Sequence, residues 1–576
     1  MLASLETQRK ALERAYPVWN ELTIWERFAQ ATFYYGARPF VELDGQSKTY
    51  EEILAEVEQA TAQLNELGVG EGSHVATIMD NSIEFVVLTF ALARLGAVKI
   101  PLNTKLSVDE WRYLLRQSEA ELLLIQLHDP GQAERICTLC RKFAREGMDN
   151  TFPKLRVMAS IGVESGIGGC SLPRWEELSK PGPNGTAFHE AHVPNQPSDI
   201  IYTSGCTGRP KGVLLTHDML CRSAYANCLN RGFEFGRRIF IPLPLFHVYG
   251  YVEGLLAAIL VGGTILLTRE KCTSAHMLDI IERQRANDIL AVPSLMMEVL
   301  KDHSLPERDL SSLHAVYCSA SVCPRWVWGA IRERLGIQDV ITGYGMTEVC
   351  GATIQTAPED PPEIAASSVG RILPAGASGS PEYGGLQAQY KVVDPVTGKV
   401  CPPGTSGELW CRGLVVTKGY YQDPRGTAAM IDAEGWLHTG DVGQFDERGY
   451  LHLEGRTHDV YKINGENVSP KLIEDIISDC PNVKYVEVVG VPDPKAGESG
   501  AAFLELEAGA RREDVIDYCK THLGRFQVPK YFFFSLREVW PQTATGKVQK
   551  GKLRAMAQAL LRGEKCGEGA ADFVKL

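Results

Sequence analysis

Residues 199–217 read DIIYTSGCTGRPKGVLLTH, and this stretch decides how the rest of the chain is interpreted. Its β-branched start predicts a strand that leads into a loop rich in glycine and hydroxyl groups. Glycine lets backbone amides approach a polyphosphate closely, hydroxyl groups add donors, and a lysine adds positive charge. An ordinary turn is the alternative, but so many of these residue types in one short loop favour a phosphate site. The residues expected to contact phosphate are Thr203, Ser204, Gly205, Cys206, Thr207, Gly208 and Lys211.

Length and composition predict a globular protein with several structural units. A chain of 576 residues is too long for one core, so we expect at least two units, and three to four at typical domain sizes. The net charge of −12 argues against non-specific nucleic-acid binding, although it leaves room for a local basic site. The 15 cysteines are irregularly spaced, which predicts free thiols and a cytoplasmic location rather than a disulfide framework.

The sequence predicts neither a signal peptide nor a membrane span, and its last residues, Val574-Lys575-Leu576, differ from a peroxisomal address in having valine where a small residue is usual. The first residues mix acids and bases without an apolar core, so we expect no signal peptide. The longest apolar run, near residues 254–267, is too short for a membrane span and predicts a buried helix followed by a strand. Cys137 and Cys140 form a C-x-x-C without a second pair at zinc-site spacing, so we expect buried thiols on a helix.

Alternating strand-like and helical patterns predict two α/β series. In the first, we expect strands at 74–79, 98–102, 121–126 and 155–159, separated by helices at 83–95, 109–117 and 132–145. In the second, we expect strands at 239–242, 264–268, 288–292, 315–319 and 339–342. Frequent glycine from 368 to 454 suits a small β-barrel. After it, a mixed α+β pattern returns, with helices at 470–478 and 512–523 and strands at 483–490 and 501–506.

A second chemical stretch, residues 341–351, reads ITGYGMTEVCG directly after a predicted strand. The glycines at 343 and 345 would let the ring of Tyr344 lie beside a flat ligand. Together with Gly351, they would leave room at the floor of a pocket. Thr347 offers a hydroxyl for a phosphate, and Glu348 offers a carboxylate for Mg²⁺. A strand-to-turn connection with a solvated glutamate is the alternative.

Three further residues stand in stretches that suit nucleotide binding. Asp441, in WLHTGD, offers an acceptor for ribose hydroxyls, and Arg456, in GRTHDVYKINGENVSP, offers a donor fork. Lys547 stands next to a glycine in PQTATGKVQK, a composition typical of a mobile loop that can carry a lysine into a site. Each of these residues, taken alone, is more often an ordinary surface residue.

Taken together and in this order, the stretches resemble the adenylate-forming superfamily of acyl-CoA synthetases, peptide-synthetase adenylation domains and beetle luciferases. The resemblance covers nearly the whole chain, from about residue 22 to about residue 561. It implies an N-terminal domain at 1–455, made of two α/β subdomains and a small β-barrel, a hinge at 456–458, and a small mobile α+β domain at 459–576. It also implies that a carboxylate attacks the α-phosphorus of ATP to give acyl-adenylate and pyrophosphate, after which a thiol displaces AMP.

The resemblance assigns roles residue by residue. The glycine-rich loop would hold the β- and γ-phosphates, and Lys547 would bridge the substrate carboxylate and the α-phosphate. Thr347 would contact the α-phosphate, while Glu348, with Thr203, would hold Mg²⁺. Ser319, Ala320 and Ser321 would line the adenine, with Tyr344 stacking on it beside Gly343, Gly345 and Met346. Asp441 and Arg456 would bind ribose hydroxyls. Lys462 would lie near the acyl-adenylate, and Asn464 and Gly465 would lie where the pantetheine arm passes. His247, in FHVYG, would border the acyl pocket.

Two positions depart from the family pattern. Cys206 stands where threonine is usual, so a weak thiol donor replaces a hydroxyl and we expect a modestly higher KM for ATP. His458 stands at the hinge, where aspartate or lysine is usual, so domain rotation could depend on pH; a tolerated exposed residue is the alternative.

The expected substrates are a carboxylic acid, ATP and CoA, without nucleic acid. The apolar stretch after His247 suits a medium- or long-chain fatty acid or an aryl acid, and no obvious charge is present for a second carboxylate or an amino group. A stand-alone enzyme that loads a carrier-protein pantetheine, luciferase-type oxidation and a non-catalytic nucleotide-binding scaffold are alternatives. Pairing of two copies into a homodimer is compatible with these features.

Overall fold

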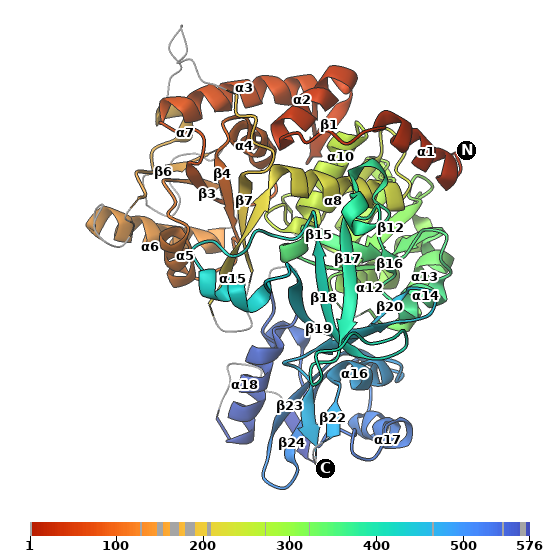
Figure 1. Ribbon diagram of the computed structural model, residues 1–576. Helices are drawn as coiled ribbons and strands as arrows, with labels where there is room; N and C mark the ends of the chain where they lie inside the picture. The colour runs from red at the N-terminus through yellow and green to blue at the C-terminus, as the bar shows by residue number, and fades with distance from the viewer. Residues whose placement is uncertain are drawn as a thin grey trace.

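The computed structural model describes most of the chain, in which α/β, antiparallel and α+β parts follow one another from top to bottom of Figure 1. The described residues are 3–126, 130–146, 152, 154–161, 172–178, 190–203, 209–270, 272–321, 323–463, 466–543, 546–564 and 572–575. Among them, no helix is long and apolar enough to cross a membrane.

The first sheet carries the glycine-rich loop between its last two strands. Its strand order is β6-β5-β3-β4-β7-β8, parallel except for the antiparallel pair β7–β8. The strands are β3 (His74–Met79), β4 (Val98–Leu102), β5 (Leu122–Gln126), β6 (Val157–Ser160), β7 (Pro197–Thr203) and β8 (Lys211–Thr216). The helices between them are α4 (Ile83–Arg94), α5 (Val108–Gln117) and α6 (Pro130–Glu146). The predicted first α/β series is therefore confirmed.

The second sheet confirms the second predicted series and extends it. Its order is β13-β12-β11-β9-β10-β1-β2, with a parallel core. The strands are β1 (Pro39–Leu43), β2 (Gln46–Thr49), β9 (Arg238–Phe240), β10 (Thr264–Leu267), β11 (Asp288–Ala291), β12 (Ala315–Cys318) and β13 (Asp339–Ile341). Strand β1 comes from far earlier in the chain and pairs with β10, which the sequence did not predict.

The apolar run predicted as a helix and a strand forms the common core of the two sheets. It contains the π-helix η1 (Tyr251–Leu256), then α10 (Ala257–Leu260), and then β10. Every residue of η1 and α10 is buried. The C-x-x-C cysteines also lie as predicted, since Cys137 and Cys140 are buried on α6.

Two antiparallel sheets follow and enclose a shared core, which accounts for the predicted small barrel. One contains β14 (Gly343–Met346), β15 (Gly351–Gln355) and β16 (Arg371–Ile372). The other contains β17 (Ala388–Val393), β18 (Gly407–Gly413), β19 (Leu437–Phe445) and β20 (Leu451–Arg456). The side chains of Tyr344, Ile354, Val392, Leu409 and Leu451 pack together between them.

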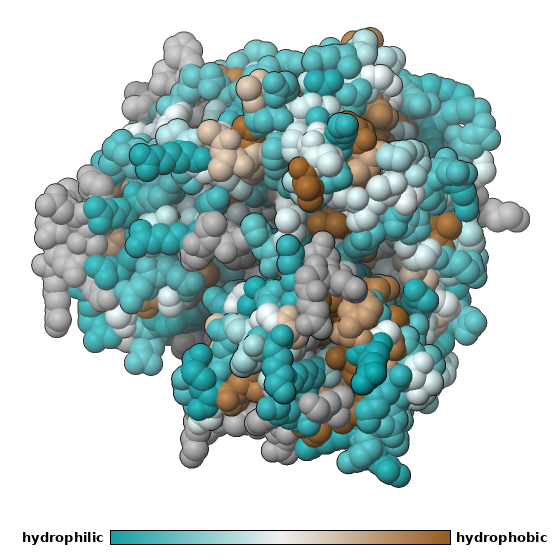
Figure 2. Space-filling view, turned by 60° about the horizontal axis from the view of Figure 1, so that its bottom comes forward, coloured by the Kyte–Doolittle hydropathy of each residue, from teal (hydrophilic) through white to brown (hydrophobic). Residues whose placement is uncertain are grey.

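The last part of the chain, blue in Figure 1, is a mixed sheet covered by helices. Its strands are β21 (Tyr461–Ile463), β22 (Glu466–Val468), β23 (Val483–Asp493), β24 (Gly497–Leu506), β25 (Tyr531–Phe534) and β26 (Asp572–Lys575). Its helices are α16 (Pro470–Ser478), α17 (Arg512–His522) and α18 (Lys550–Leu561). The face of the molecule in Figure 2 is largely hydrophilic, and apolar residues appear on it in small groups.

Candidate active site

The β7–β8 hairpin holds the two ends of the glycine-rich loop side by side. Thr203 is the last residue of β7 and pairs with Lys211, the first residue of β8. The Nζ atom of Lys211 lies 4.6 Å from the centre of the Tyr420 ring. Ser204, Gly205, Cys206, Thr207 and Gly208 lie outside the described residues, so their phosphate contacts stay predictions.

A buried ion pair anchors strand β7 just before this loop. The Nζ atom of Lys99 lies 3.3 Å from Asp199 Oδ1, and both side chains are almost fully buried. Lys99 also donates to Thr89 Oγ1 at 3.0 Å. Burial lowers the pKa of Lys99, whereas the carboxylate of Asp199 opposes that shift. Removing one partner would leave the other charge buried and unpaired, so this pair constrains where the loop begins.

Glu348 is buried beside the hairpin, where it accepts a hydrogen bond from Tyr420. It lies in the short helix η3 (Thr347–Val349), and Thr347 is buried as well. The hydroxyl of Tyr420 donates to Glu348 Oε1 at 2.9 Å. Burial raises the pKa of Glu348, and the hydrogen bond from Tyr420 offsets part of that rise. Tyr420 therefore contacts both predicted phosphate-side residues, Lys211 and Glu348, and the sequence analysis missed it.

Asp441 lies at the centre of a second polar group, formed by neighbouring strands. Asp441 on β19 pairs with Arg456 on β20 in the sheet register, and Arg456 Nε donates to Asp441 Oδ1 at 2.9 Å. The hydroxyl of Tyr344 donates to the other carboxylate oxygen at 2.7 Å. The two predicted ribose-binding residues and the predicted adenine-stacking residue are thus joined through one carboxylate.

The predicted adenine loop follows strand β12 and is tied to Gly343. Ser319 Oγ donates to the carbonyl of Gly343 at 2.7 Å. Ala320 adopts a φ of +75°, which is unusual for a residue other than glycine. Ser321 lines a narrow cavity that faces α16 and β23. Met346 ends strand β14 beside these residues.

The expectation that glycines leave room at the floor of a pocket was wrong at two positions. A Cβ on Gly343 would lie 2.7 Å from the hydroxyl of Tyr317, and one on Gly345 would lie 1.8 Å from the carbonyl oxygen of Gly351. The space is already filled, because β14 and β15 pack closely at these residues. These glycines therefore permit strand pairing rather than open a cavity.

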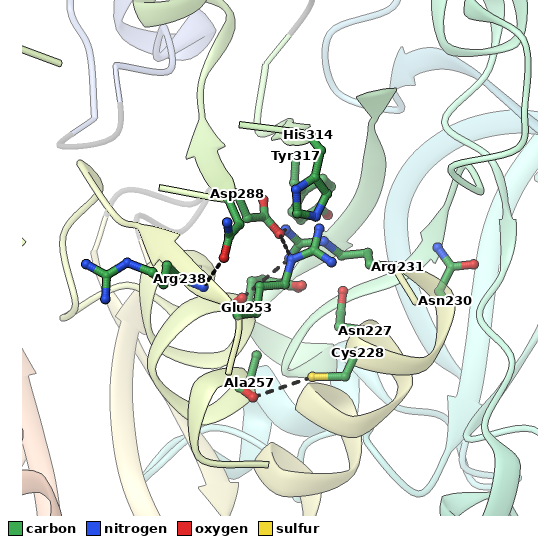
Figure 3. Close-up of polar contacts among 12 residues, drawn as sticks. Asn227, Cys228, Asn230, Arg231, Arg238, Glu253, Ala257, Asp288, His314 and Tyr317 are labelled. Carbon is green, nitrogen blue, oxygen red and sulfur yellow. Dashed lines mark hydrogen bonds and ion pairs between the residues drawn. The ribbon is translucent and has the colours of Figure 1, made fainter. Parts of the chain in front are cut away.

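An ionisable side chain, Glu253, lies in the predicted wall of the acyl pocket, where no obvious charge was expected. It belongs to the π-helix η1, and its Oε1 accepts from the backbone N–H of Ala352 at 2.9 Å. Figure 3 shows Glu253 beside Arg231, which pairs through Nη2 with Asp288 Oδ2 at 2.5 Å. Burial raises the pKa of Glu253 to about 8, so its carboxyl is mostly protonated at neutral pH. The wall therefore carries a polar group without a net negative charge.

Lys547 reaches this group of residues from the C-terminal part of the chain. Part of its side chain remains exposed, yet the surrounding protein lowers its pKa, first by limiting hydration and then through Arg456, while Asp441 opposes the shift. Burial, together with the charge of Lys547, lowers the pKa of His247 to about 4. His247 precedes α9 (Val248–Gly250), and its Nδ1 accepts from the N–H of Tyr249, so its ring is neutral and oriented.

The residues predicted near the acyl-adenylate and the pantetheine arm are only partly described. Lys462 is exposed on β21, and its backbone N–H donates to Glu498. Asn464 and Gly465 lie outside the described residues.

The sequence matches the AMP-binding enzyme family over residues 26–421 and the AMP-binding enzyme C-terminal domain over residues 472–547. The Bacillus subtilis protein YngI is 33% identical over 520 residues, 88% of this chain and 91% of that protein. The mitochondrial medium-chain acyl-CoA ligase ACSF2 of Danio rerio is 30% identical over 543 residues, 91% of this chain and 86% of that protein.

Two solved structures of CoA ligases have the same fold as this chain. An anthranilate CoA ligase, AuaEII, in complex with anthranoyl-AMP superposes with a TM-score of 0.82 at 24% identity, over 95% of this chain and 99% of that chain. The o-succinylbenzoate CoA synthetase MenE of Bacillus subtilis, in complex with its acyl-adenylate intermediate, gives 0.74 at 26% identity, over 92% of this chain and 98% of that chain. Family match, relatives and fold agree on ATP-dependent ligation of an acid to CoA. The chain therefore belongs to the AMP-binding enzyme family and is an acyl-CoA synthetase of the adenylate-forming superfamily.

Proposed function

We propose that the enzyme activates a hydrophobic carboxylic acid as acyl-AMP, with release of pyrophosphate, and then transfers the acyl group to CoA. The observation that carries this proposal is the approach of Lys547 to Asp441, Arg456 and His247. A carboxylate and a polyphosphate repel each other, so their reaction needs a fixed cation where charge develops. Lys547 is suited to that task because it arrives from a separate part of the chain, beside groups that suit ribose and the acid.

Each predicted site residue has a role in this proposal. Lys547 would bridge the acid and the α-phosphate, and Thr347 would donate to that phosphate. Asp441 and Arg456 would hold the ribose, while Tyr344, Gly345 and Met346 would lie along the adenine. The β- and γ-phosphates would lie on the loop between Thr203 and Lys211, and adenine would also contact Ser319, Ala320 and Ser321.

Mg²⁺ fits the donors at this place. The buried carboxylate of Glu348 and the hydroxyl of Thr203 are oxygen donors, which Mg²⁺ prefers. Within the part of the chain that the structure describes, no cluster of three or more His, Cys, Asp or Glu side chains could form a metal cage. Mg²⁺ commonly binds through one or two carboxylates together with substrate phosphates, so a single glutamate suffices. The ion would neutralise phosphate charge when bound.

The acid is proposed to be a medium- or long-chain fatty acid or an aryl acid. The helices η1 and α10 provide a buried apolar wall behind His247, which is neutral above about pH 4. Glu253 is mostly protonated at neutral pH and is engaged with Ala352, so it presents no fixed charge to an acyl chain. The name of the Danio rerio relative, a medium-chain acyl-CoA ligase, agrees with a hydrophobic acid.

Transfer to CoA is proposed to follow rotation of residues 459–576 about a hinge at 456–458, which includes His458. Lys547 would then leave the site, Lys462 would lie near the acyl-adenylate, and Asn464 and Gly465 would line the path of the pantetheine arm. The described cysteines include free, buried thiols such as Cys221 and Cys228, which supports a reducing compartment, and we place the enzyme in the cytoplasm.

Pyrophosphate release from ATP and a panel of carboxylic acids, with and without CoA, tests the proposal. Fatty acids and aryl acids should each be compared with amino acids and dicarboxylates of similar size. We expect acid-dependent release with hydrophobic acids, and acyl-CoA only when CoA is present. The absence of acid-dependent release across the panel would refute the proposed function, and release without acyl-CoA would refute CoA as the acceptor.

A further inference from the structure

The loop that carries Lys547 is held by one arginine, Arg537. Arg537 Nη2 donates to the carbonyl oxygen of Gly546, the residue directly before Lys547, at 2.6 Å. Gly546 adopts a φ of +76°, so the chain turns sharply at the bonded carbonyl. Within the loop, the N–H of Thr543 donates to the carbonyl of Lys547 at 2.7 Å, and the N–H of Gly546 donates to the carbonyl of Thr543 at 3.0 Å. The guanidinium therefore fixes the backbone from which the Lys547 side chain leaves.

Arg537 is itself placed by an aromatic ring. Its Cζ lies 4.5 Å from the centre of the Tyr485 ring, a cation–π distance. The N–H of Arg537 also donates to Glu505 Oε2 at 2.6 Å. A guanidinium that stacks on a ring and donates to a carbonyl loses little freedom on forming the second contact, because its plane is already set.

Tyr485 reaches across to the N-terminal part of the chain. Its ring packs against the apolar core beneath α12 (Pro293–Lys301) and against the C-terminal core that contains Phe503 and Phe533. Tyr485 and Arg537 line one side of a cavity of about 50 Å³, and Pro293, Ser294 and Met297 of α12 line the opposite side. Two ion pairs join the same two parts of the chain, Lys301 with Glu507, and Arg325 Nη1 with Asp479 Oδ2 at 3.7 Å.

We infer that Tyr485 and Arg537 are positioning residues for adenylation: contact of Tyr485 with α12 sets Arg537, and Arg537 presents Lys547 to the site. The inference rests on the proposed function of Lys547. The contact with α12 belongs to the arrangement in which Lys547 approaches His247, so the two residues couple docking of the C-terminal part to placement of the catalytic lysine. Neither residue contacts the reacting atoms, and both act through the loop backbone.

Separate measurement of the two half-reactions tests this inference. Acyl-AMP formation is followed by pyrophosphate release without CoA, and thioester formation is followed from supplied acyl-adenylate and CoA. For Arg537→Ala we expect kcat of acyl-AMP formation to fall about tenfold, the usual effect of losing one charge-assisted hydrogen bond, with KM for ATP unchanged. Thioester formation should change by less than about twofold, because Lys547 has no part in that step.

Matched variants separate positioning from folding. Arg537→Lys keeps the charge and one donor, so it should recover most of the lost rate. Arg512→Ala removes a cation–π contact of the same kind, 5.0 Å above Phe534, and should leave acyl-AMP formation unchanged. Tyr485→Leu should slow acyl-AMP formation in the wild type and add little to Arg537→Ala, because both changes interrupt one series of contacts.

These measurements distinguish failure of the inference about Tyr485 and Arg537 from failure of the proposed function. A wild-type enzyme without acid-dependent pyrophosphate release would defeat the proposed function itself. If the wild type is active and Lys547→Ala is slow, unchanged acyl-AMP formation in Arg537→Ala would overturn the inference alone. Equal losses in both half-reactions, or a lowered thermal midpoint with no recovery in Arg537→Lys, would show that Arg537 only stabilises the fold and would also overturn it.

Discussion

The hydroxyl of Tyr420 donates to the carboxylate of Glu348 at 2.9 Å, while the ring of the same tyrosine lies under Lys211. One aromatic side chain thereby links the carboxylate proposed for Mg²⁺ to the lysine proposed for phosphate. The arrangement keeps a buried acid ready to ionise, because a donor to the carboxylate favours the charged form.

For Tyr420→Phe, we predict that the Mg²⁺ concentration giving half-maximal activity rises several-fold, most strongly near pH 6. Loss of the hydrogen bond removes one cause that lowers the pKa of Glu348, so burial raises that pKa further and more of the acid is protonated at low pH. Mg²⁺ titrations at pH 6 and pH 8 measure the effect. Tyr421→Phe is the control, since Tyr421 donates to Glu119 instead, and an identical response of the two variants would contradict the prediction.

For Lys547→Ala, we predict that adenylation slows on the order of 10²–10³-fold, the usual cost of one preorganised donor at a developing charge. Thioester formation from preformed acyl-adenylate should be much less affected, because Lys547 acts in the first half-reaction only. Single-turnover assays of each step measure this split. The exposed Lys552 provides the control variant Lys552→Ala, and equal losses in both steps of Lys547→Ala would refute the proposed role.

For Asp441→Asn, we predict that KM for ATP rises about tenfold or more, which matches the loss of a hydrogen bond to a charged group. The neutral amide weakens the ion pair with Arg456 and cannot accept equally well from Tyr344. Initial rates against ATP concentration provide the measurement. Asp432→Asn weakens a partly exposed contact with His438 on the same strand, so an equal rise in that variant would mean that the effect is not specific to Asp441.

For Glu253→Gln, we predict a flatter dependence of stability on pH. The pKa of Glu253 is about 8 in the folded chain against an ordinary value of 4.5, so the folded state holds a proton that the unfolded state has lost. Stability from this group is therefore full below about pH 4.5 and falls as the pH rises toward 8, at up to about 1.4 kcal/mol per pH unit. Denaturant unfolding at pH 6 and pH 8.5 measures the difference, and an unchanged slope in the variant would contradict the prediction.

Local patterns of sequence predicted most of the fold, because strands and helices of parallel α/β units follow hydrophobic periodicity. Helix α16 begins and ends where its pattern does. The placement of β1 beside β10 was missed, since pairing between distant segments leaves no trace in local periodicity. The same reason explains β25 and β26 at the far end of the chain.

The candidate site was likewise predicted only in part from the sequence. Asp441 and Arg456 were predicted separately, and the register of β19 with β20 brings them together. Tyr420, Lys99 and Arg537 were missed because each contacts a residue far away in sequence, namely Glu348, Asp199 and Tyr485 respectively. Glycine residues at 343 and 345 were interpreted as open space, whereas close strand pairing requires them.

Strand β1 has a consequence for any shortened form of the protein. It lies between β10 and β2, so the parallel sheet that carries β12 and the adenine loop depends on a segment from the start of the chain. Removing residues up to 49 would turn β10 into an exposed edge with unpaired backbone groups, next to the fully buried α10. An expression fragment limited to the apparent nucleotide-binding region would thus have an exposed edge strand that can pair with another copy. Self-association would then compete with folding of the fragment.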